Sequence, residues 1–95
     1  MRLGDAEGAL SLFRSSKTVL EQRMLVDGNN VQIAQDVARI FLRTGTANSA
    51  LGDKESARSA LDQAAAILDS KKDKLDSYGR RLREDIASER AALDL

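Results

Sequence analysis

Two pairs of acidic residues recur in the sequence at the same spacing, Asp5 with Glu7 and Asp53 with Glu55. Paired carboxylates can carry out general acid–base chemistry when one of them keeps its proton. Both pairs, however, follow a Leu-Gly dipeptide and precede a helix-forming run. Because a helix N-terminus favours a capping side chain and negative charge, we interpret the two pairs as parts of helix starts.

Histidine and cysteine are absent from the 95 residues. The sequence therefore lacks the commonest general base, the thiol nucleophile and the usual zinc ligands. The two Leu-Gly-Asp segments contain too little glycine to cradle a phosphate, and their carboxylates would repel one. These observations predict a protein that is not an enzyme and that uses no cofactor and no metal.

Basic residues gather in two short clusters, at Lys71–Lys74 and at Arg80–Asp85. Acidic residues are interleaved with both clusters, and the whole chain balances 15 basic against 15 acidic side chains. Tyr78 is the only aromatic residue near them, so a platform for stacking bases is missing. We expect solvated helix faces here, and no nucleic-acid partner.

Arg39 and Arg43 are the pair of charges whose spacing best suits a ligand. Residues four apart lie on the same face of a helix, and two guanidinium groups one turn apart can hold a carboxylate or an acidic peptide. The alternatives are that both arginines are simply solvated, or that they pair with Asp36 on the same helix.

The sequence predicts that helices position these residues. The chain contains no proline and only three aromatic residues, and residues of high helix propensity dominate it. Breaks are predicted at 27–30, 51–53 and 70–77, where Gly, Asn, Asp and Ser gather. The last turn is placed at Asp76-Ser77, although Asp69-Ser70 offers the same Asp-Ser cap chemistry. The four expected helices span 5–26, 31–50, 53–70 and 78–94, with Asp5, Asn30 and Asp53 as caps.

Each expected helix carries an apolar or small stripe along one face. The stripes comprise Ala9, Phe13, Ser16 and Leu20; Ala34, Val37, Ala38, Phe41, Gly45 and Asn48; Ala57, Ala60, Leu61, Ala64, Ile67 and Leu68; and Leu82, Ile86 and Leu93. Gly45 stands mid-helix, where glycine costs about 1 kcal/mol relative to alanine. We therefore expect it at a close contact with the third or the first helix.

The first and third helices repeat one another at a constant offset of 48 residues, from Gly4 to Gly52. Identical residues recur at seven positions: Leu3, Gly4, Asp5, Glu7, Ala9, Ser11 and Leu20 match Leu51, Gly52, Asp53, Glu55, Ala57, Ser59 and Leu68. Phe13 corresponds to Leu61, so this position of the helix face is apolar in both copies although the residue differs. Self-similarity at a fixed period indicates a helical repeat.

These residues resemble the tetratricopeptide (TPR) repeat family. Its second-helix pattern is matched by Gly52-Asp53, Ala57, Leu61 and Ala64, and in the first copy by Gly4-Asp5, Ala9 and Phe13. Its first-helix pattern, an aromatic residue four before a glycine, is matched by Phe41 and Gly45. The period exceeds the usual value of about 34 residues and looks like that of an extended variant found in bacterial serine/threonine protein kinases and other bacterial signalling proteins.

The resemblance implies an all-α fold of antiparallel hairpins in a TPR-like α-solenoid of about four helices. Residues 1–95 would form a single domain, with 5–26 as the second helix of one repeat, 31–70 as a full hairpin and 78–94 as a terminal capping helix. Its concave groove would be lined by Arg39, Leu42, Arg43, Thr46 and Ala50. An unrelated helical bundle that arose by duplication is the alternative.

The implied function is a non-catalytic scaffold that binds a protein or peptide, with a structural oligomerisation module as the alternative. The first helix has no partner helix before it, so we expect some of its apolar residues to stay exposed and the isolated chain to form a homodimer through it. No apolar run is long enough for a membrane span, so we expect no membrane partner. A cytoplasmic location is expected, although the absence of cysteine is equally compatible with the periplasm.

Overall fold

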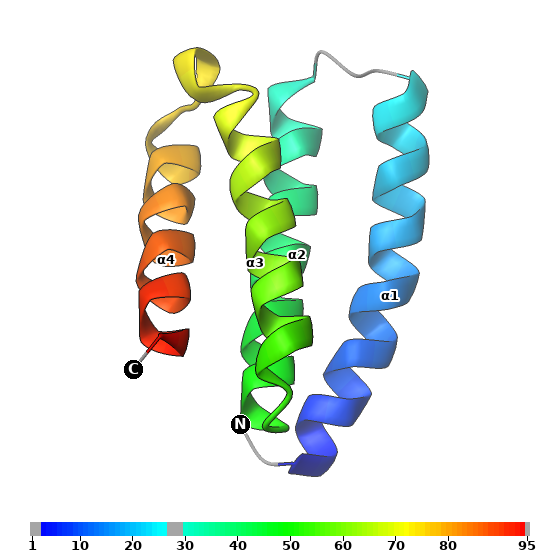
Figure 1. The fold of residues 1–95 in the computed structure, drawn as a ribbon. Helices are drawn as coiled ribbons and strands as arrows, with labels where there is room; N and C mark the ends of the chain where they lie inside the picture. The colour runs from blue at the N-terminus through cyan, green and yellow to red at the C-terminus, as the bar shows by residue number, and fades with distance from the viewer. Residues whose placement is uncertain (1–2, 27–29, 95) are drawn as a thin grey trace.

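A computed structural model describes residues 3–26 and 30–94 of the chain. The described residues form four α-helices and no strand, which confirms the predicted all-α class (Figure 1). The helices are α1 (Leu3–Val26), α2 (Val31–Ala50), α3 (Lys54–Asp69) and α4 (Ser77–Leu93), and a short 3₁₀ turn, η1 (Lys72–Lys74), precedes α4.

Successive helices run antiparallel, and α2 is the central one. It packs against α1, α3 and α4, while α4 also packs against α3. Figure 1 shows α1 and α4 on opposite sides of the hairpin formed by α2 and α3. As a result, α2 and α4 run in the same direction, and α1 has α2 as its main neighbour.

Three of the helices begin at a side-chain cap, as their sequences predict. In each cap a side-chain oxygen accepts a hydrogen bond from the backbone nitrogen three residues later, which satisfies a donor that the helix leaves free. The bonds run from Ile33 to Asn30, from Ser56 to Asp53 and from Gly79 to Asp76, with lengths of 3.1, 3.0 and 2.9 Å. The predicted breaks before α3 and α4 are therefore confirmed.

The predicted start of the first helix is wrong by two residues. The helix α1 begins at Leu3, so Asp5 lies within its first turn and does not occupy the cap position. No proline lies between Leu3 and Asp5, and the helix continues through Gly4. At the equivalent place before α3, Gly52 adopts a positive φ of 80°, which ends the preceding segment and leaves Asp53 to cap. The predicted turn residues Gly28 and Asn29 lie outside the described residues.

The core lies between α2, α3 and α4 and contains most of the predicted stripe residues. Its buried members include Val37, Ala38, Phe41, Ala57, Ala60, Leu61, Ala64, Leu68, Leu82, Ile86 and Leu93. Ile67 and Asn48 are only partly buried. The residues that resemble the repeat pattern in α2 and α3 thus lie at one helix interface.

The stripe of α1 is less deeply buried than its counterpart on α3. Ala9, Phe13 and Ser16 are half-buried, and Leu10, which lies outside the predicted stripe, is buried and packs with Ala47 of α2. Leu12 and Val19 are 64% and 57% exposed. The two copies of the sequence differ in burial because α3 lies between two helices, whereas α1 packs mainly on one.

Three ion pairs join α3 to α4 in a constant antiparallel register: Arg58 with Asp94, Asp62 with Arg90 at 3.0 Å, and Asp69 with Arg83 at 2.9 Å. From one pair to the next, the α3 residue moves one or two turns along its helix, and its partner moves the same number of turns in the opposite direction along the chain. A slip of one turn would bring together Arg58 with Arg90, or Asp62 with Asp94. Exposed pairs add little stability, but the change of sign between Arg58 and Asp62 disfavours these wrong registers.

The tightest contact between α2 and α3 is at Gly45. A Cβ atom at this position would lie 2.8 Å from Cγ of Leu61 and 3.3 Å from the carbonyl oxygen of Ala57. These distances are shorter than van der Waals contact, so the backbone of α2 can approach α3 this closely only with glycine here. The structure therefore supplies the packing reason expected for a mid-helix glycine.

We predict that Gly45→Leu lowers the free energy of unfolding by roughly 1–3 kcal/mol, because the added side chain overpacks the contact with Leu61. The matched control is Gly8→Leu, since a Cβ at Gly8 would meet no atom within 4 Å. Leucine has the higher helix propensity, so the control should unfold at the same temperature or a higher one. Thermal unfolding at low protein concentration checks both, and an unchanged midpoint for Gly45→Leu would contradict the prediction.

Candidate functional site

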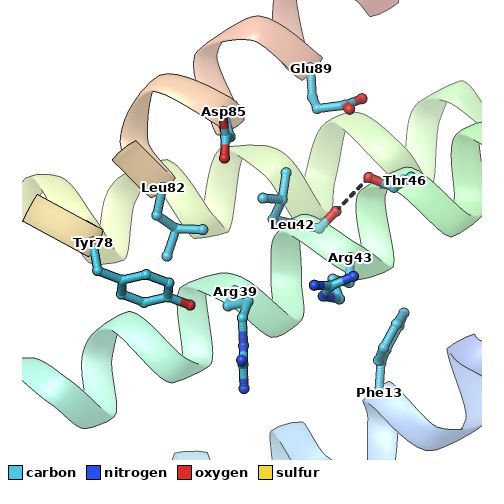
Figure 2. Close-up of a pocket in the computed structure, with 9 residues that line it drawn as sticks. All are labelled: Phe13, Arg39, Leu42, Arg43, Thr46, Tyr78, Leu82, Asp85 and Glu89. Carbon is cyan, nitrogen blue, oxygen red and sulfur yellow. Dashed lines mark hydrogen bonds between the residues drawn. The ribbon is translucent and has the colours of Figure 1, made fainter. Parts of the chain in front are cut away.

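A hollow of about 350 Å³ lies over α2, between α1 and α4. Its lining consists of Phe13 from α1, Arg39, Leu42, Arg43 and Thr46 from α2, and Tyr78, Leu82, Asp85 and Glu89 from α4 (Figure 2). Four of the five groove residues that the family resemblance implies therefore line one hollow. The fifth, Ala50, is exposed at the end of α2 and does not line it.

The hollow has two charged sides and an apolar middle. Figure 2 shows Arg39 and Arg43 on the side nearer α1, and Asp85 and Glu89 on the side formed by α4. The side chains of Leu42, which is half-buried, and of Leu82, which is buried, lie between the two sides. We call these sides the arginine wall and the acidic wall. Sequence reasoning found the arginine wall only, because the acidic wall depends on where α4 packs.

None of the four wall charges forms an ion pair within the described residues. Asp36, the predicted alternative partner of the arginines, accepts a hydrogen bond from Gln32 at 3.2 Å instead. Arg39, Arg43 and Asp85 are exposed, and Glu89 is half-buried. Opposite charges thus face one space without neutralising one another, which leaves them available to groups of a ligand.

Thr46 and Tyr78 lie near the two ends of the hollow. The Thr46 hydroxyl donates to the carbonyl oxygen of Leu42 in its own helix at 3.1 Å, so it can offer a ligand only an acceptor (Figure 2). The ring of Tyr78 is 41% exposed and extends toward the space near Arg39. These two residues can therefore contribute polar contacts as well as apolar area.

Asp53 of the second acidic pair has a structural contact at the start of α3. The carboxylate of Asp53 is held by the backbone N–H and the hydroxyl of Ser56, and these bonds lower its pKa below the usual value. It is consequently ionised at neutral pH and serves as a cap. Because its pKa is lowered by folding, its contribution to stability is present at neutral pH and is lost as the pH falls through that lowered pKa.

The basic clusters have structural contacts or are solvated. Arg80 donates to the carbonyl oxygen of Leu75 at 3.3 Å, which ties α4 to the segment before it, and Arg83 pairs with Asp69. Lys72 and Lys74 are exposed in η1. Within the described residues, no cluster of three potential metal ligands occurs.

Gln35 is a residue that sequence reasoning missed. It is fully buried, and neither atom of its amide has a hydrogen-bond partner among the described residues. Its Oε1 lies so close to Gly79 that a Cβ there would be 2.2 Å away. Gln35 lies one turn before Arg39 and contacts the residue that follows Tyr78, so it is close to the Tyr78 end of the hollow. Glutamine is usually exposed, and no sequence signal marks this one as buried.

No family model, no curated protein and no solved structure matches this chain. None of the described helices combines the length and the apolar character that crossing a membrane requires. The fold and the hollow are therefore the observations from which a function can be argued.

We predict that Gln35→Met raises the free energy of unfolding by about 1–2 kcal/mol, because a buried amide without partners costs roughly that much and methionine fills a similar volume. The comparison variant Gln35→Ala should lower it, since truncation leaves a cavity. Chemical denaturation measures both. A loss of stability in Gln35→Met would mean that the amide is better satisfied than the structure indicates.

Proposed function

We propose that this chain is a non-catalytic protein-interaction module that binds a peptide or protein segment in the hollow over α2. The observation that carries the proposal is the convergence of Arg39, Arg43, Leu42 and Thr46 with residues of α1 and α4 around one space. Unpaired arginines one turn apart offer fixed, charge-assisted donors to carboxylates, and the leucines offer apolar area.

We further propose that the module is a TPR-like piece of a helical-repeat scaffold. The close approach of α2 to α3 at Gly45 and the turn at Gly52-Asp53 support this assignment, because they occur at the positions where the sequence resembles the family. In such scaffolds the chain recognises a partner with a preformed helical surface. By the same resemblance, the scaffold would belong to a bacterial signalling protein. A cytoplasmic location stays a prediction, with the periplasm as the alternative.

We predict that short peptides selected on this protein from a phage-displayed random library carry acidic residues and bind at the arginine wall. The double change Arg39→Ala, Arg43→Ala should weaken their binding about tenfold or more, and the loss should shrink as salt is raised. Fluorescence anisotropy with the selected peptides measures both effects.

The matched control is Lys72→Ala, Lys74→Ala, which removes the same charge at exposed positions outside the hollow. It should leave the affinity unchanged. If selected peptides bind the double arginine variant as tightly as the original protein, the proposed site is wrong.

A structural oligomerisation module is the second candidate, and the exposure of Leu12 and Val19 favours it. These residues lie two turns apart on one side of α1, and apolar side chains gathered at a surface often mark an interface. In this case α1 would join copies of the chain as a symmetric dimer.

We predict for this candidate that sedimentation shows a dimer at high concentration and that Leu12→Asp dissociates it, because burying a charge in an apolar contact is unfavourable. Ser11→Asp is the matched control, since it adds the same charge at the neighbouring exposed position. A monomer at every concentration, or a dimer that Leu12→Asp leaves intact, would exclude association through α1.

A further inference from the structure

We infer that the occupant of the hollow is an amphipathic helix of another protein that carries acidic residues along one side of an apolar stripe and basic residues along the other. This inference rests on the proposed function and specifies its partner. It goes beyond an acidic peptide, because the structure adds a second wall of the opposite charge to the arginines that the sequence revealed.

Charge complementarity requires both signs in the partner. A purely acidic segment would gain contacts at Arg39 and Arg43 but would meet repulsion from Asp85 and Glu89 across the same space. A segment with acids toward the arginine wall and bases toward the acidic wall satisfies both. Its apolar residues would then lie over Leu42 and Leu82.

A helix has the geometry that this arrangement needs. Successive helical residues point about 100° apart, so the two neighbours of a residue that faces the floor point toward opposite walls. Arg39 and Arg43 are one turn apart, as are Asp85 and Glu89, and α2 and α4 run in the same direction. Residues one turn apart on a helix laid along the hollow would repeat at the same interval of about 6 Å. In an extended strand, by contrast, alternate side chains point in opposite directions, and a floor residue has no neighbours aimed at the walls.

A second copy of the chain fits the hollow less well. The same hollow on a second copy would leave a space between the two that neither fills, and close packing at interfaces disfavours such voids.

The test uses two synthetic peptides of equal composition, each about four helical turns long. The first, the two-row peptide, has glutamates on one side and lysines on the other side of a leucine stripe. The second, the mixed peptide, exchanges the two signs at alternate turns, so that each side carries both. Circular dichroism verifies equal helicity, and anisotropy titrations measure affinity. We expect the two-row peptide to bind at least about tenfold more tightly than the mixed peptide.

Charge reversal of the walls tests the same point in the protein, and only the combined reversal of both walls leaves the net charge of the chain unchanged. The half-reversals Arg39→Glu, Arg43→Glu and Asp85→Lys, Glu89→Lys each create two walls of one sign, and each should weaken the two-row peptide about tenfold or more. The combination of all four changes exchanges the walls. A two-row helix turned end to end presents its rows to the opposite walls, so the fourfold variant should bind the same peptide with its original affinity. The changed side chains are exposed or half-buried, and circular dichroism verifies that each variant folds.

The outcomes separate this inference from the proposed function. If both peptides bind equally, or neither binds, while library-selected acidic peptides still depend on Arg39 and Arg43, the two-row partner is wrong and the proposed function stands. If no selected peptide depends on the arginines either, the proposed function fails and this inference fails with it. If light scattering shows a dimer that the half-reversals dissociate, the occupant is a second copy of the chain and the inference is overturned.

Discussion

The structure depends on how closely α2 can approach the helices around it. Small residues make this approach possible: Ala34, Ala38, Gly45 and Ala47 are all buried on α2, and Gly45 leaves room for Leu61 where even a methyl group would collide. A helix with neighbours on three sides has one strip of surface left, and on α2 that strip carries Arg39, Arg43 and Thr46. The hollow is thus a consequence of the same packing that builds the core, because α1 and α4 flank the strip without meeting over it.

Local features of the fold were predictable from the sequence because they depend on residues close together in the chain. Asn30, Asp53 and Asp76 each cap a helix through a bond to a backbone nitrogen three residues on, and the stripes of α2, α3 and α4 follow from periodicity alone. The prediction for Asp5 was wrong although its sequence context matches that of Asp53. A cap residue itself leaves the helical conformation, as Asp53 does after the positive φ of Gly52, whereas Asp5 lies within α1.

Only half of the candidate site was predictable from the sequence, because only that half depends on residues close together in the chain. Arg39 and Arg43 share a face of one helix, so spacing alone placed them together. Asp85 and Glu89 come from a helix whose position over α2 is set by tertiary packing, and in the sequence Asp85 is simply one of the acids next to a run of arginines. Gln35 is a similar case: its burial follows from the approach of α4 at Gly79, and nothing in its own neighbourhood indicates it.

The acidic wall is held in place by contacts on another side of α4. Arg83 and Arg90 of α4 pair with acids of α3, and Leu82 and Ile86 form the buried stripe of α4. Asp85 and Glu89 lie on the other side of this stripe from Arg83 and Arg90. If α4 rotated about its axis to bring its own acids toward α3, these would meet Asp62 and Asp69, which repel them, and the buried stripe would be exposed. The ion pairs therefore need not contribute much stability to matter. Together with the buried stripe, they favour the orientation of α4 in which Asp85 and Glu89 face the hollow.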